Sequence, residues 1–163
     1  MVPTRAGVER HGVVGNTFGE LRFLPDEESS MSNISPNQDE FRKLIEKHEG
    51  PIVMINLLKF KAKAQGEEGT GAEAYSRYGS KVVKMIEALG GKVLWSGQPK
   101  SVLIGGSSDQ WDAVALVQYP NPKALLEMGL RPEYQEIHKH REAGLERTVL
   151  IACTPTSLLT FPE

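Results

Sequence analysis

Hydrophobic and polar positions change their period along the chain, and the changes predict alternating helices and strands. Apolar residues recur at helical spacing over 41–48 and again over 75–89. A near-continuous apolar run at 52–60 is typical of a buried strand, and its lack of alternation predicts cover on both faces. Further apolar segments that predict strands lie at 92–97, 101–106, 111–119 and 147–155.

Capping residues mark where two of the helices begin. Ser35, Pro36 and Gln38 supply a cap, a favoured first helical residue and a capping-box partner. Thr70 and Glu73 repeat the capping-box pattern before the longer helix. Both patterns place a helix start immediately before an apolar periodic segment.

The order of these segments predicts the fold. A third helical region over 121–144 is interrupted near Pro132 and ends at Gly144, which offers a C-terminal cap. The chain therefore reads as an extra helix followed by βαββαβ, the order of a ferredoxin-like α+β fold with an antiparallel sheet. Helices would cover one sheet face, and the other would expose an apolar patch, so we expect a homodimer.

Length and composition favour one domain. The 163 residues, 39% hydrophobic and 25% charged, lie in the ordinary globular range. Residues 1–34 lack sustained periodicity, so we expect a mobile N-terminal extension, a single domain over 35–158 and a C-terminal tail at 159–163. Met31 stays open as an alternative translation start, because organised patterning begins just after it.

Net charge and cysteine content limit the classes of binding partner and the cellular compartment that the sequence favours. A formal net charge of -2 gives no electrostatic footprint for nucleic acid. Charges and glycines interrupt the N-terminal region too often for a signal peptide or a membrane span, so no membrane partner is expected. The single cysteine, Cys153, cannot form an intramolecular disulfide, which favours the reducing cytoplasm.

The sequence favours neither a metal nor a cofactor. His138 and His140 lie about 200° apart around a helix, so they cannot readily hold one metal together. Paired cysteines, an HExxH motif and an acidic calcium loop are all missing from the sequence. The glycine-rich segments lack the lysine and the strand-to-helix context of a phosphate loop. We therefore expect no cofactor, although binding of haem or flavin stays open.

Asn56 is a polar residue within the apolar run. It shares strand parity with Ile52, Met54, Leu58 and Phe60, which places an amide on an apolar face. A buried amide without partners costs about 1 to 3 kcal/mol. Asn56 is therefore either fully bonded within the protein or a substrate-binding residue.

One helix face combines apolar contacts with an imidazole and a guanidinium, because Tyr134, His138 and Arg141 recur at helical spacing. His138 could exchange a proton in catalysis, and Arg141 could bind a carboxylate or enolate with two hydrogen bonds. Tyr78 and Trp95 would bind substrate if their helix and strand face one another. A structural role in the core remains the alternative for each of these residues.

Several strings of this sequence resemble the domain of unknown function 1330 family of dimeric alpha-beta barrel proteins. They are INLLKF, AYSRYG, GGKVLWSG, WDAVALVQYPNPKALLEM and PEYQEIHKHREAGLERTVLIACTP. The resemblance implies a ferredoxin-like dimeric alpha-beta barrel over roughly residues 51–155. It implies little chemistry, since related barrels include cofactor-free monooxygenases, haem-dependent enzymes and isomerases.

Two functional hypotheses follow. In the first, a pocket between sheet and helices binds a small organic acid or an aromatic ligand, in a protein that resembles a cofactor-free oxygenase or isomerase. In the second, the protein is a noncatalytic dimeric binding or structural module, and the same polar groups only satisfy one another. RNA binding by the sheet is disfavoured, because the strand WDAVALVQY lacks the basic and glycine-aromatic signature.

Overall fold

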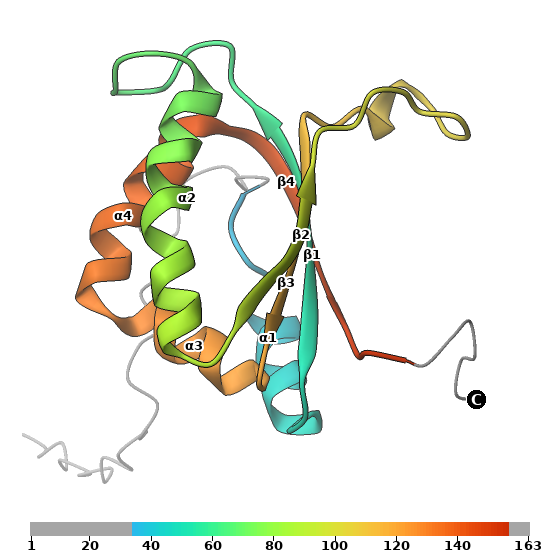
Figure 1. The fold of residues 1–163 in the computed structure, drawn as a ribbon, viewed down its shortest axis with the longest axis vertical. Helices are drawn as coiled ribbons and strands as arrows, with labels where there is room; N and C mark the ends of the chain where they lie inside the picture. Colours follow the sequence, from blue (N-terminus) through green and yellow to red (C-terminus); the bar gives the residue numbers. More distant parts are fainter. Residues whose placement is uncertain (1–33, 157–163) are drawn as a thin grey trace, which may run out of the picture.

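The computed structural model describes residues 34–156, which form one antiparallel sheet with helices packed against one of its faces (Figure 1). The expected N-terminal extension, Met31 and the C-terminal tail lie outside the described residues, apart from Ile34. The elements are α1 (Gln38–Lys47), β1 (Ile52–Phe60), α2 (Gly71–Ala88), β2 (Lys92–Gly97), η1 (Ser107–Asp109), β3 (Ala113–Tyr119), α3 (Pro122–Leu130), α4 (Pro132–Gly144) and β4 (Leu145–Cys153).

The sheet has the order β2-β3-β1-β4, so the predicted ferredoxin-like βαββαβ arrangement is confirmed, with α1 as the extra helix. β1 is a central strand, because it pairs antiparallel with β3 on one side and with β4 on the other. The observed bounds of β1 and β2 equal the predicted 52–60 and 92–97. The 101–106 segment is not a strand, and the last strand begins two residues earlier than predicted.

The helix termini agree with the sequence in part. The capping box of Thr70 and Glu73 is present at the start of α2, as predicted. The cap of α1 is Asn37 and not Ser35, because the Asn37 side chain accepts hydrogen bonds from the first-turn backbone. Gly144 is the last residue of α4, and the extended Leu145 caps the helix in its place.

The hydrophobic core lies between the sheet and the helices. Even-numbered β1 residues such as Ile52 and Met54 point toward α2, which contributes Val82 and Ile86. Full burial of an aliphatic side chain like that of Ile52 stabilises the fold by about 1.5 to 3 kcal/mol. The buried side chains of this core are Ile52, Met54, Tyr78, Val82, Ile86, Val117, Tyr119, Ala124, Met128, Tyr134 and Ile137.

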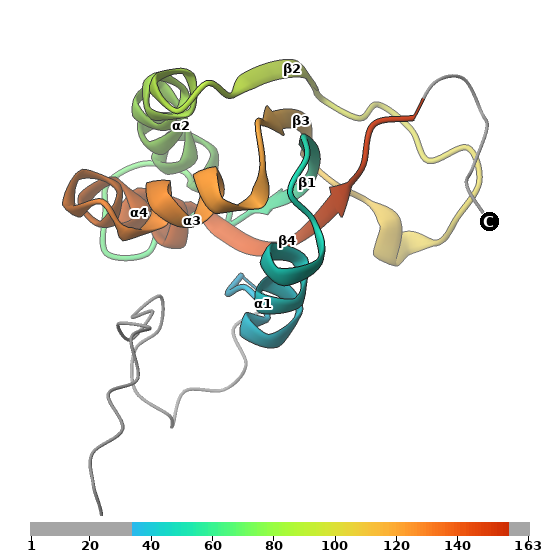
Figure 2. The same ribbon diagram turned by 90° about the horizontal axis from the view of Figure 1, so that it is seen from below.

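Among the described residues, no helix packs against the opposite sheet face (Figures 1 and 2). Odd-numbered β1 residues point to this side, and the strand register pairs Ile55 with Ile151 and with Leu116. Ile151 keeps 44% of its surface exposed. Within residues 34–156, the second face of β1 therefore lacks the cover that the apolar run predicts. We define the open sheet face by Val53, Ile55, Leu57, Trp95, Val114, Leu116, Val149 and Ile151.

Candidate functional site

A row of five rings runs between the sheet and the two long helices. The ring centroids of Phe60 and Tyr75 are 5.3 Å apart, and those of Tyr75 and Tyr78 are 5.4 Å apart. Tyr134 lies 6.2 Å from Tyr78 in an edge-on contact, and His138 lies 5.3 Å from Tyr134. The row joins β1, α2 and α4, so it exists only once these three elements pack.

Local helical spacing places each member of the row. Tyr75 and Tyr78 are three residues apart on α2, while Tyr134 and His138 are four residues apart on α4. Residues three or four positions apart share a helix face. Because α2 packs against α4, the two faces meet, and the next position on the α4 face belongs to Arg141.

His138 lies at the α4 end of the row with 15% of its side chain exposed. Within residues 34–156, its buried Nδ1 has no hydrogen-bond partner, and its Nε2 is 3.6 Å from a Glu142 carboxylate oxygen. Burial lowers the pKa of His138 to about 4, and the Arg141 charge acts in the same direction. The imidazole is therefore neutral near pH 7, with one nitrogen available to a ligand.

Arg141 places a cation beside the row. Its Nη1 donates a 3.1 Å hydrogen bond to the carbonyl oxygen of Ile34, which is 107 positions away in the sequence. The ion pairs within residues 34–156 do not include Arg141. The guanidinium therefore has a neutral acceptor and no carboxylate in the described part of the chain.

Two tyrosines of the row, Tyr75 and Tyr78, stay uncharged. Burial raises the pKa of Tyr75, and the nearby Arg141 charge opposes the rise only partly. Burial also raises the pKa of Tyr78 well above its usual value, and the Tyr134 hydroxyl adds to the shift. The Tyr78 and Tyr134 hydroxyls share a 3.4 Å hydrogen bond. The surroundings of Arg141 thus combine one positive charge with neutral polar groups.

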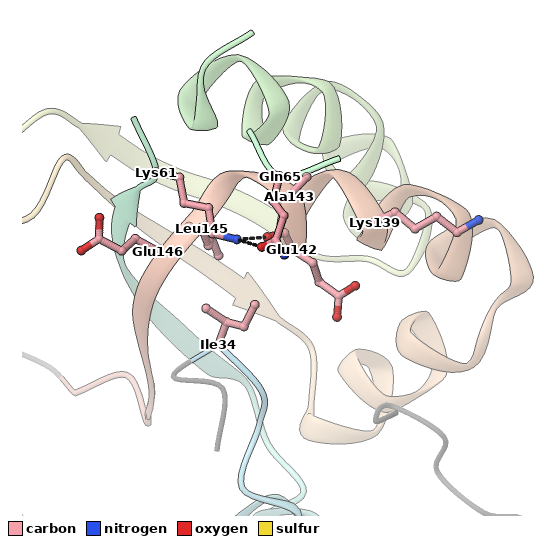
Figure 3. A pocket seen from close by; sticks show the side chains of 8 residues that line it. All are labelled: Ile34, Lys61, Gln65, Lys139, Glu142, Ala143, Leu145 and Glu146. Atoms are coloured by element: carbon pink, nitrogen blue, oxygen red, sulfur yellow. Dashed lines mark hydrogen bonds between the residues drawn. The ribbon is translucent and has the colours of Figure 1, made fainter. Parts of the chain in front are cut away.

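The described residues form two open hollows, and the row contributes Phe60 and Tyr75 to one of them. The hollow beside Tyr75 has a volume of about 250 Å³ and is mostly apolar, with Ser96 and Gln98 among its lining residues. The hollow beside Ile34, drawn in Figure 3, has a volume of about 450 Å³. Figure 3 shows the Lys61 amine bonded to Gln65 Oε1 and to the Glu142 carbonyl oxygen at this second hollow.

Comparison with known proteins decides the family. The model of the family described as domain of unknown function 1330 matches residues 66–154. The chain belongs to the DUF1330 family. RPA0582, a protein of unknown function from Rhodopseudomonas palustris, is 40% identical over 77% of this chain and 98% of its own, with a TM-score of 0.72. The structure of methylated RPA0582 is also 40% identical, over 78% of this chain and 97% of its own, with a TM-score of 0.73.

A weaker likeness joins the DUF1330 chain to a dimeric ferredoxin-like protein of unknown function from Jannaschia sp. CCS1, at 12% identity and a TM-score of 0.45. The alignment covers 65% of this chain and all of the Jannaschia protein. No curated protein matches the sequence. The family and the fold are thus shown, and the chemistry has to be argued from the site.

The structure brings three of the five predicted site residues together. Tyr78, His138 and Arg141 lie along the row, inside the segment that matches the DUF1330 model. Asn56 faces the helices from β1, but its amide donates to the carbonyl oxygens of Met54 at 3.2 Å and Ala115 at 3.4 Å. These bonds favour the structural interpretation of Asn56.

Trp95 lies apart from the other four. The β2 register shifts between Val93 and Trp95, so Val93 pairs with the buried Val117 while Trp95 pairs with Leu116 of the open sheet face. Trp95 is 54% exposed. It therefore does not face Tyr78, and a role in the same pocket would need a contribution from a second molecule.

Sequence reasoning missed a charged cluster on the outer side of the helices. Glu67 accepts a 2.8 Å bond from Arg77 of α2 and lies 2.6 Å from Nδ1 of His140 on α4. The Arg77 bond lowers the pKa of Glu67, burial opposes this shift, and the His140 contact lowers the pKa further. A single acidic residue in a charged loop gave no local signal of this pairing, because its partners lie 10 and 73 positions away.

The described part of the chain offers neither a candidate metal site nor a candidate membrane span. Residues 34–156 contain no group of three or more His, Cys, Asp or Glu side chains that could hold a metal ion. Among the described helices, none is both long and apolar enough to span a membrane.

Proposed function

We propose that this DUF1330 protein binds a small organic acid, with or without an aromatic portion, between its sheet and its helices. The observation that carries the proposal is the buried His138 Nδ1, which lacks a hydrogen-bond partner in the described residues and lies beside Arg141. A buried unsatisfied nitrogen costs about 1 to 3 kcal/mol, so a ligand that bonds to it recovers that energy.

The apolar hollow beside Tyr75 supports the aromatic part of the proposal. It is lined by Phe60, Tyr75 and the apolar residues of β3, which suit the flat face of a ring. Tyr78 and Tyr134 would contribute hydroxyl groups along the way to His138. This division into an apolar part and a few converging polar groups is typical of small-molecule sites.

An oxygenase-like or isomerase-like reaction would use His138 as the base. A neutral imidazole can accept a proton from a carbon acid, and Arg141 would stabilise the enolate that forms. The low pKa of His138, about 4, makes it a weak base. A ligand carboxylate against Arg141 would offset the nearby positive charge and raise that pKa.

A noncatalytic binding module is the second candidate, and two observations favour it. The Asn56 amide already donates hydrogen bonds to backbone carbonyls, and the low pKa of His138 makes it a weak base. In both candidates we propose a homodimer formed through the open sheet face, since residues 34–156 leave that apolar surface uncovered. A cytoplasmic location remains a prediction from the single cysteine.

A thermal-shift screen of the full chain tests the proposal. Carboxylates, aromatic acids, haem and flavins would be compared, with oligomeric mass measured alongside. We expect stabilisation by acids that is lost in His138→Ala and retained in Trp95→Ala. If stabilisation were equally strong in His138→Ala, the proposed site would be wrong. Turnover of a stabilising ligand would favour the enzyme, and stable binding without turnover would favour the module.

A further inference from the structure

Arg141 has a backbone carbonyl where a partly buried guanidinium usually has an anion. The fork of an arginine carries five N–H donors and suits a carboxylate with two parallel bonds. Within residues 34–156, the hydrogen bond of this fork runs from Nη1 to the Ile34 oxygen. The carbonyl satisfies a donor without neutralising the charge.

Within residues 34–156, no carboxylate forms an ion pair with the guanidinium. Tyr75 and Tyr78 stay protonated, and His138 is neutral. The nearest acidic side chain of the same helix is Glu142, which faces the outer Nε2 of His138 and is 47% exposed. A solvated carboxylate on that side leaves the inner side of Arg141 positive.

Arg141 contacts the chain shortly before α1. Ile34 meets α4 through this hydrogen bond, and the chain leads from there to the Asn37 cap of α1. Ile34 is half-buried and also lines the larger hollow, together with Glu142 and Leu145 (Figure 3). Ile34 therefore contacts both that hollow and the guanidinium.

We propose that the ligand of this site is a carboxylate that replaces the Ile34 carbonyl as the acceptor of Arg141, so that residues 34–37 are a cover which the ligand displaces. The inference rests on the proposed function and specifies its ligand class. A charge-assisted bond to a carboxylate is stronger than the neutral bond it replaces, which gives the exchange its driving force. His138 Nδ1 then bonds to a second polar atom of the same ligand.

Matched acids and amides test the charge requirement. Acetate, benzoate, phenylacetate and pyruvate would be titrated into the full chain beside the corresponding amides, with binding measured by calorimetry. We expect the best acid to bind about tenfold more tightly than its amide or better, which corresponds to the difference between a charge-assisted and a neutral hydrogen bond.

Variants of Arg141 test the residue. Arg141→Gln should reduce acid affinity to that of the amide, and Arg141→Lys should retain part of it because the charge remains. Arg131→Gln is the matched control, since Arg131 is a partly exposed guanidinium paired with Glu127 at the junction of α3 and α4. Thermal unfolding of each variant shows whether the fold is kept.

The backbone carbonyl NMR signal of Ile34 tests the displacement. It should shift on addition of the acid in the wild type and should be shifted without ligand in Arg141→Gln. Equal affinity for acids and amides would overturn the carboxylate assignment while leaving a binding site in place. Acid binding with an unchanged Ile34 signal would overturn the cover. Failure of every acid and every amide to bind would overturn both this inference and the proposed function.

Discussion

Gly71 and Gly144 cross with their backbones in direct contact, so that a Cβ on either residue would overlap the carbonyl oxygen of the other. Lys61 completes the junction, because its N–H donates to Gly144 O at 2.9 Å and its carbonyl accepts from Gly71 N at 3.0 Å. The end of β1, the start of α2 and the end of α4 are thereby joined. The distance between the two helices that carry the ring row depends on this contact.

Gly71→Ala should destabilise the fold by about 1 to 3 kcal/mol, the usual effect of overpacking. The backbone atoms of Lys61 and Gly144 cannot move aside as a flexible side chain could. Gly79→Ala, in the middle of α2 with open space around its Cα, is the control and should stabilise by up to about 1 kcal/mol. Urea unfolding measures both, and equal effects of the two substitutions would contradict the close-contact explanation.

The stability that the charged Glu67 contributes should be lost in acid. Its pKa is lowered in the folded state by Arg77 and then by His140. A carboxylate with a lowered pKa stabilises the fold above its unfolded pKa, and this stability is lost as the pH falls through the lower folded value. Glu67→Gln should therefore flatten the melting temperature profile below about pH 4.5. Glu136→Gln, which removes an exposed pair with Lys139, should leave the profile unchanged.

His138 should produce a separate pH dependence at a higher pH. Its pKa is about 4 in the folded state against 6.5 for the free side chain, so the unfolded chain binds the proton first. Stability is therefore complete above about pH 6.5 and falls, on the order of 3 kcal/mol in total, as the pH decreases toward 4. The groups that face the imidazole are Tyr134, Arg141 and Glu142.

His138→Phe should remove the fall in stability between pH 6.5 and 4 while leaving the acid limb that Glu67 contributes. Proton NMR titration of the imidazole provides a direct check in the wild type. A folded-state pKa near 6.5 would show that His138 is solvated, which would contradict its assignment as a buried neutral group.

The open sheet face should carry the homodimer. Ile151→Glu places a charge on strand β4 of this face, opposite Ile55 of β1, and should reduce the mass measured by light scattering to that of one chain. Leu130→Glu is the control, because Leu130 is 55% exposed at the end of α3 on the helix side of the sheet. A dimeric Ile151→Glu protein would place the association surface elsewhere.

Local information predicted the elements well. The apolar run at 52–60, the capping box of Thr70 and Glu73, and the helical spacing in 132–144 depend on residues within a few positions of each other. Such patterns can be read from one sequence because backbone propensity, capping and side-chain period act over short distances. Tyr134, His138 and Arg141 were placed on one helix face for the same reason.

Contacts between distant residues were decided only by packing. The exposure of Trp95 follows from a shift in pairing with β3, and parity along β2 alone would place Trp95 beside Val93. Local sequence could not predict the bond from Arg141 to Ile34, because the partners are 107 positions apart. The same holds for His140 and Glu67, which are 73 positions apart. The sequence by itself determined which groups could do chemistry, and the tertiary structure decided which of them meet.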